Sequence, residues 1–316
     1  MIGAIVALVM AIVLWTIKNR NSQKSAVADK QPFLWQAPST RDLPPTAEGE
    51  LIRYGEKLVV NTSRYLGPKG VVGVFSNGMN CQNCHLAAGT RPYGNNYSAV
   101  FSTYPKFRAR SGMVEDIYKR VNDCMERSLN GSSLDTGSQE MKALSAYINW
   151  LGKNVPKSGK PSGAGITDLT FLGRAADPRK GSLLYMQKCQ ACHGKEGQGL
   201  PAADSGCYTY PPLWGDHSYT TSAGLYRISR FAGYVKDNMP FGASHGTPLL
   251  TDEEAWDLAA FVNSQPRPDK RFKGDWPDIA GKPVDHPFGP YADSFSENQH
   301  KFGPFGPIQS VKQHHS

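Results

Sequence analysis

The sequence lacks several features that would each point to a familiar class of protein. It has no clustered runs of Lys or Arg, which argues against a nucleic-acid-binding tract, although the net charge of +8 favours anionic substrates or partners. Two of its six cysteines, Cys124 and Cys207, stand too isolated to suggest a disulfide framework. Hydrophobic residues make up only 39% of the chain, which is below the average for globular domains. The apolar side chains alone are therefore too few to fill the hydrophobic core of a small domain.

Four of the six cysteines fall in two Cys-x-x-Cys-His motifs, which are typical of c-type haem attachment. The two thiols of such a motif form thioethers to the porphyrin, and the adjacent imidazole reaches the iron. A zinc site or a redox dithiol uses the same cysteine spacing, but neither explains a histidine after both pairs. We therefore predict two covalently bound haem c groups, one held by Cys81, Cys84 and His85 and the other by Cys189, Cys192 and His193.

The spacing of the motifs predicts one small domain around each haem. We expect a mainly α chain with two class I cytochrome c-like domains, at residues 46–155 and 169–265, joined by a linker at 156–168. A long irregular extension, residues 266–316, follows. Its repeated aromatic and Gly-Pro elements predict that it packs back on the body.

Apolar periodicity and capping residues predict the helices that frame each haem. In the first domain we expect helices at residues 48–64, 111–128 and 138–153, with Ser111 as the cap of the second. In the second domain we expect a closing helix at 250–265, which begins with a capping box formed by Thr251 and Glu254.

The N-terminal 17 residues are apolar and uncharged, a length between a signal-peptide core and a short membrane span. We predict an anchor or signal segment at residues 1–20 and a polar tether at 21–45. Cleavage is the less favoured alternative, although Lys18, Arg20 and Lys24 conflict with the positive-inside rule for an anchor. The prediction is a periplasmic body tethered to the cytoplasmic membrane.

The open face of the second iron has one favoured ligand. Met239 lies in an Asn-Met-Pro-Phe-Gly loop, and a thioether there raises the reduction potential as in electron-transfer cytochromes. His217, His245 and Lys236 remain alternatives. We interpret Cys207 as an inert buried thiol.

In the first domain, Arg120, Cys124 and Ser128 follow one another at helical spacing, so they share one stripe. One interpretation is a small buried thiol beside a solvated basic face. The alternative is a thiolate, because Arg110, Arg120 and Arg127 make its surroundings electropositive, and a thiolate binds metals and attacks sulfur.

Several stretches resemble the dihaem thiosulfate dehydrogenases, which couple two thiosulfates into tetrathionate. They are residues 104–111, residues 120–131 with the element Cys-Met-Glu-Arg-Ser, both haem motifs and residues 299–305. The resemblance implies that His85 and Cys124 ligate the catalytic iron, with Arg110, Arg120 and Ser128 around the substrate. It also implies that His193 and Met239 ligate the iron of an electron-outlet haem.

The resemblance implies an oxidoreductase that converts thiosulfate to tetrathionate and passes two electrons to an external redox partner, such as a small cytochrome or an iron-sulfur protein. The same site would serve tetrathionate reduction. Two alternatives are a membrane-tethered dihaem electron carrier without its own substrate and a carrier subunit that holds a persulfide on Cys124.

Overall fold

The computed structural model describes residues 34–203 and 206–314, so the apolar segment and most of the tether predicted at the N-terminus lie outside the described residues. Within the described ranges, no helix combines the length and the apolar character that crossing a bilayer requires. Below, residues 46–155 are called the first module, residues 169–265 the second module, and residues 266–314 the extension.

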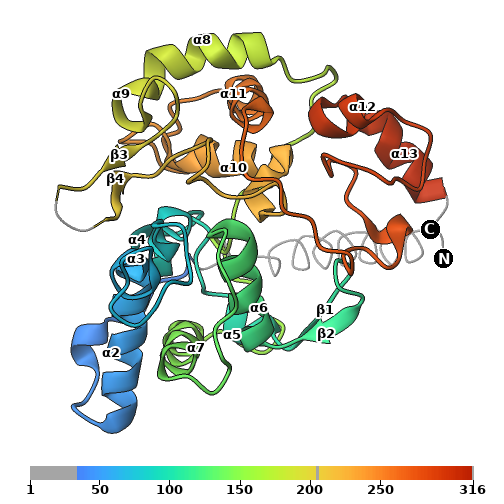
Figure 1. Cartoon of the computed structure of the whole chain (residues 1–316). Helices are drawn as coiled ribbons and strands as arrows, with labels where there is room; N and C mark the ends of the chain where they lie inside the picture. The colour runs from blue at the N-terminus through green and yellow to red at the C-terminus, as the bar shows by residue number, and fades with distance from the viewer. Residues whose placement is uncertain (1–33, 204–205, 315–316) are drawn as a thin grey trace, which may run out of the picture. The chain divides into compact units, whose positions relative to one another are not determined.

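The first module is built around two long helices that cross each other, α2 and α7 (Figure 1). Its elements are η1 (Thr40–Asp42, just before it), α2 (Ala47–Val60), α3 (Thr62–Leu66), η2 (Cys81–Asn83), α4 (Leu86–Gly89), α5 (Val100–Thr103), β1 (Lys106–Arg108), β2 (Met113–Glu115), α6 (Ile117–Asp123), the π-helical turn η3 (Cys124–Ser128) and α7 (Gln139–Leu151). Ser138 caps α7, since its side chain accepts a hydrogen bond from the Met141 amide.

The second module repeats this plan with α8 and α11, and the extension adds two helices that the sequence did not predict (Figure 1). The elements are α8 (Pro178–Lys188), α9 (Gln190–His193), β3 (Leu200–Pro201), β4 (Tyr208–Tyr210), η4 (Gly224–Tyr226), α10 (Ile228–Asn238), α11 (Asp252–Ser264), η5 (Ile279–Gly281), α12 (Glu297–Phe302) and α13 (Gly306–His314). The predicted capping box of Thr251 and Glu254 is confirmed.

Both helix crossings depend on a glycine. A Cβ on Gly55 of α2 would lie 2.1 Å from the carbonyl oxygen of Ala143 in α7. A Cβ on Gly181 of α8 would lie 2.0 Å from the carbonyl oxygen of Asp257 in α11. No real contact is so short, so only glycine lets the two backbones approach this closely.

The segment before Cys124 differs from the single helix predicted at residues 111–128. Residues 106–108 and 113–115 form an antiparallel hairpin instead, with Gly112 in its turn at a φ of 66°. The helix starts at Ile117, because Asp116 and not Ser111 accepts the capping hydrogen bond, from the Lys119 amide. At Cys124 the helix widens, and the Leu129 amide donates to the Cys124 carbonyl.

The modules and the extension belong to one compact unit, Trp35–Ser316. Tyr234 of α10 donates a hydrogen bond to the Asn83 carbonyl beside the first haem motif, over 3.1 Å. In the extension, Phe305 is only 2% exposed. Its ring centroid lies 5.1 Å from that of Phe171 and 5.8 Å from that of Trp256, both in the second module. The extension therefore contributes to the core of the second module.

Candidate functional site

The first haem motif opens on a cavity of about 440 Å³, which is lined by both thiols and the imidazole of the motif. Burial raises the pKa of Cys81 to about 11 and that of Cys84 to about 12, so both thiols are neutral near pH 7. Nδ1 of His85 donates to the Asn95 carbonyl over 2.5 Å, and burial lowers the pKa of His85 to about 4. The ring is therefore a neutral imidazole, with Nε2 left to bind iron.

The predicted catalytic residues come together on the same cavity. Arg110, Arg120, Cys124 and Ser128 all line it, although they arise from the hairpin, from α6 and from η3 and not from one regular helix. The thiol of Cys124 is the main cause of a raised pKa at Arg120, so the two side chains are close neighbours. This places a potential thiolate beside a guanidinium group.

Six arginine side chains line this cavity: Arg108, Arg110, Arg120, Arg127, Arg227 and Arg230. Three of them form ion pairs with carboxylates, Arg127 with Asp123 and Asp275, Arg227 with Asp285, and Arg230 with Asp168. Their charge is already compensated inside the protein. The sequence did not identify Arg108, Arg227 or Arg230, because no local pattern brings them to Cys124.

The other three arginines, Arg108, Arg110 and Arg120, have no carboxylate within ion-pair distance among the described residues. Nη1 of Arg110 donates only to the Ser222 carbonyl, over 3.1 Å, and its guanidinium lies 5.5 Å from the Trp276 ring centroid. Burial, followed by the neighbouring Arg127, lowers the pKa of Arg110 to about 10. Arg110 therefore remains a cation near pH 7. Together with Arg108 and Arg120, it can bind an anion from solution.

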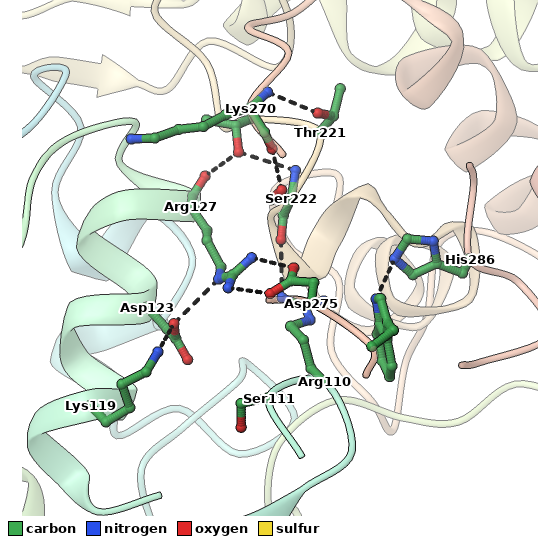
Figure 2. A network of polar contacts seen from close by, with 12 residues as sticks. Arg110, Ser111, Lys119, Asp123, Arg127, Thr221, Ser222, Lys270, Asp275 and His286 are labelled. Atoms are coloured by element: carbon green, nitrogen blue, oxygen red, sulfur yellow. Dashed lines mark hydrogen bonds and ion pairs between the residues drawn. The ribbon is translucent and has the colours of Figure 1, made fainter. Parts of the chain in front are cut away.

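The extension contacts two of the cavity arginines, Arg110 and Arg127, from outside the cavity lining (Figure 2). Asp275 accepts two hydrogen bonds of 2.7 Å from Arg127, which also contacts Asp123 at 3.3 Å. The amide of Trp276 donates to the Arg110 carbonyl over 2.6 Å. The sequence predicted that the extension packs on the body, but nothing in its pattern indicated that Asp275 would hold an arginine of the first module.

The second haem motif opens on a larger cavity of about 690 Å³, lined by Cys189, Cys192, His193 and Met239. Nδ1 of His193 donates to the Pro211 carbonyl over 2.9 Å, and burial lowers the pKa of this histidine. As at His85, Nε2 of a neutral ring is left to bind iron.

The alternative ligands of the second iron are engaged elsewhere or lie off the cavity. Lys236 contacts the Leu250 carbonyl and Asp252, both at 2.7 Å. His245 stacks on Tyr93 with ring centroids 3.6 Å apart. Neither they nor His217 line the cavity, whereas Met239 does. Cys207 is partly exposed, so the prediction of a buried thiol there is wrong.

The two cavities share part of their walls: Asn80, Cys84, Tyr219 and Leu225 line both. Each cavity presents the two thiols and the imidazole of its own motif to the same space, which is the donor set that covalent haem attachment requires. The residues present therefore fit two haem c groups separated by a thin layer of side chains.

Comparison with known proteins gives two matching family models. One, described as SoxA/TsdA, cytochrome c domain, matches residues 74–156, and the other, described as cytochrome c, matches residues 178–266. The thiosulfate dehydrogenase of Stutzerimonas stutzeri is 36% identical over 74% of this chain and 73% of its own length. That of Allochromatium vinosum is 38% identical over 73% of this chain and 83% of its own length.

A solved structure is also similar, that of the thiosulfate dehydrogenase TsdBA from Marichromatium purpuratum in its as-isolated form. The TM-score is 0.69 and the identity is 33%. The match covers 76% of this chain and 51% of that one, so this chain spans about half the length of that protein.

Proposed function

This chain belongs to the thiosulfate dehydrogenase family, and we propose that it joins two thiosulfate dianions into one tetrathionate. It is an oxidoreductase that acts on thiosulfate, and its two cytochrome c domains each carry a covalently bound haem c. The observation that supports this proposal best is the set of three arginines beside Cys124 that have no carboxylate partner within residues 34–203 and 206–314.

The arginines address the main electrostatic cost of the reaction. Two dianions at about 4 Å repel four times as strongly as two unit charges, by roughly 4 kcal/mol in water and roughly 16 kcal/mol at an effective dielectric constant of 20. Arg108, Arg110 and Arg120 together supply three compensating charges. Their planar guanidinium groups also offer donors in a fixed geometry to sulfonate oxygens, which orients the outer sulfur atoms.

Cys124 provides the nucleophile in this proposal, and together with His85 it would hold the iron of the first haem. Its Sγ forms a bond to the outer sulfur of one thiosulfate, with loss of two electrons and no proton. The outer sulfur of the second thiosulfate then attacks the adduct, the S–S bond to Cys124 breaks, and tetrathionate leaves while the thiolate is restored. When bound, the two haems would supply the oxidant for this step, because they accept the two electrons.

Electrons would leave through the second module, where Met239 is the proposed second ligand, to a small cytochrome or an iron-sulfur protein. The steps are reversible, so tetrathionate reduction is part of the proposal. The proposed location is the periplasm, because covalent haem attachment in bacteria takes place outside the cytoplasmic membrane. The predicted membrane tether lies outside the described residues and stays a prediction.

The test is steady-state turnover of the purified holoprotein with thiosulfate and with tetrathionate, using artificial redox dyes. We expect thiosulfate alone to reduce the haems and tetrathionate to accumulate at half the molar amount of thiosulfate consumed. Haems that stay oxidised with thiosulfate would indicate the electron carrier. A persulfide that persists on Cys124 without free tetrathionate would indicate the carrier subunit.

A further inference from the structure

A short segment of the first module, residues 91–95, contacts the surroundings of one proposed iron ligand in each cavity. The segment follows α4 and the first haem motif along the chain. On one side, the Asn95 carbonyl accepts the hydrogen bond from Nδ1 of His85, over 2.5 Å. On the other side, the segment contacts residues 238–245 of the second module, which include Met239 and are called the Met239 loop below.

Two hydrogen bonds join this segment to the backbone around Met239. Nδ2 of Asn238, the residue directly before Met239, donates to the Tyr93 carbonyl over 3.0 Å. Nη2 of Arg91 donates to the Ala243 carbonyl over 2.7 Å. Because one bond lies before the methionine and the other after it, the segment holds the chain on both sides of Met239.

A stacked pair of rings is the third contact between the segment and the loop. The ring of Tyr93 lies on that of His245, with centroids 3.6 Å apart and planes 11° from parallel. Neither ring lines the first or the second cavity. The stack therefore acts on the position of the loop and not directly on a haem.

Much of the Met239 loop is exposed to solvent. Phe241 is 97% exposed, and Gly242 and His245 are exposed as well. Ala243, whose carbonyl accepts the bond from Arg91, is by contrast only 2% exposed. A loop that buries little surface opens locally at low cost in free energy, so its position depends on the contacts that hold it.

The segment that holds the loop is itself fixed in place. Tyr93 and Asn95 both have a φ of 58°, a left-handed conformation that is unfavourable for residues other than glycine and persists only where the surroundings impose it. The Tyr93 amide donates to the Gly163 carbonyl over 2.7 Å, and the Asn95 amide donates to the Gly165 carbonyl over 2.8 Å. Both glycines belong to the linker between the modules.

We propose that residues 91–95 of the first module position Met239 on the iron of the second haem. The inference rests on the proposed ligation of that iron by Met239. Residues that orient a ligand without binding the metal themselves typically change metal affinity by about 10- to 100-fold when they are lost. Tyr93 is such a positioning residue, since it holds the loop through its stack on His245 and lines neither cavity.

The experiment measures how strongly Met239 is held, by titration of the ferric full-length holoprotein with imidazole. Imidazole competes with the methionine for iron and abolishes the red absorption band that a methionine ligand gives to a ferric haem. In Tyr93→Ala we expect the apparent dissociation constant for imidazole to fall at least about tenfold, because the loop releases Met239 more easily. The reduction potential of the second haem should fall as well, because a bound thioether raises it.

Two further substitutions separate the stack from other effects of Tyr93. Tyr93→Phe keeps the ring and loses only the hydroxyl, which lies 3.2 Å from Oγ of Ser162, so it should bind imidazole as the wild type does. His245→Ala removes the same stack from the side of the loop and should match Tyr93→Ala. The double variant should show no further change, because the two residues act through one contact.

The control is Tyr65→Ala, which removes another partly buried tyrosine of the first module. Its ring lies 5.8 Å from that of Tyr54, and it lines neither cavity. It should keep the wild-type dissociation constant for imidazole. Should Tyr93→Ala fail to fold, His245→Ala decides.

The outcomes distinguish an error in the ligand from an error in its positioning. If the red band survives in Met239→Ala, Met239 is not the ligand, and both the proposed ligation and this inference are wrong. If Met239→Ala loses the band but Tyr93→Ala binds imidazole as the wild type does, the ligation stands and the inference is wrong. An equal change in Tyr65→Ala would also overturn the inference.

Discussion

At the scale of single residues, the six arginines of the first cavity differ in whether a carboxylate already holds them. Arg127, Arg227 and Arg230 are paired within the protein, so their main task is to hold segments together. Arg108, Arg110 and Arg120 have no carboxylate partner in the part of the chain that the structure describes, so they remain available to an anion. This distinction could not be made from the sequence, because apart from Asp123 the paired carboxylates lie 58 to 148 positions away along the chain.

We expect Arg120→Lys to lower kcat/KM for thiosulfate at least about tenfold, because an ammonium group keeps the charge but loses the planar fork. The measurement is steady-state kinetics of the holoprotein. Arg179→Lys, at a side chain that is 93% exposed, is the control and should behave as the wild type. A change of less than about twofold in Arg120→Lys would make Arg120 an ordinary surface charge, since that is under about half a kcal/mol.

We expect Asp275→Asn to lower the free energy of unfolding by about 2 kcal/mol, since it leaves the guanidinium of Arg127 with only part of its compensation. The Arg127 side chain is 7% exposed and that of Asp275 is 17% exposed, so solvent screens this pair little. Asp269→Asn is the matched control, because Asp269 and Arg271 are 58% and 59% exposed and their pair should contribute under about 1 kcal/mol. Equal effects of the two substitutions in denaturant unfolding would contradict this account.

At the scale of secondary-structure elements, the sequence predicted regular helices better than the segment that carries Cys124. Periodicity and capping residues located α7 and α11 to within two residues, because caps and apolar faces are local signals. Residues 111–128 have similar signals, but Gly112 and the β-favouring residues after it form a hairpin instead. The π-helical turn depends on packing around the cavity, which no local pattern encodes.

The crossings of α2 with α7 and of α8 with α11 supply the next prediction. Gly55→Ala and Gly181→Ala should each lower the free energy of unfolding by at least about 2 kcal/mol, since the new methyl group meets a backbone oxygen that cannot move aside. Gly173→Ala is the control, because a Cβ there has no neighbour within 4 Å. The measurement is denaturant unfolding of the holoproteins. Equal free energies of unfolding for the three variants would show that the crossing helices can move apart without loss of stability.

At the scale of the whole molecule, the haem motifs, the two cytochrome c domains and the haem count followed from the sequence, and the comparisons confirmed them. The shared wall of the two cavities and the contacts of the extension with Arg110 and Arg127 did not follow from the sequence. Asp275 and Arg127 are 148 positions apart, and their pairing results from the folding of the entire chain. Local sequence patterns predict structure between residues that are close along the chain. Contacts between residues this far apart can be identified only once the fold is known.

The outlet module has its own test. We expect Met239→Ala to lower the reduction potential of the second haem and to slow electron exit, while thiosulfate chemistry in the first cavity continues. Redox titration and single-turnover kinetics measure the two effects separately. Met186→Ala, at a side chain that is 46% exposed and away from the cavity, is the control. If the second haem keeps its reduction potential in Met239→Ala, Met239 is not a ligand of that haem.

The most direct test of the central claim is Cys124→Gly, measured by electron paramagnetic resonance of the ferric protein and by the rate of tetrathionate formation. Both haems should stay covalently attached, because Cys81, Cys84, Cys189 and Cys192 are untouched. The account predicts that the thiolate-type low-spin signal disappears and that turnover is abolished. A signal that persists, or tetrathionate made at the wild-type rate, would contradict it.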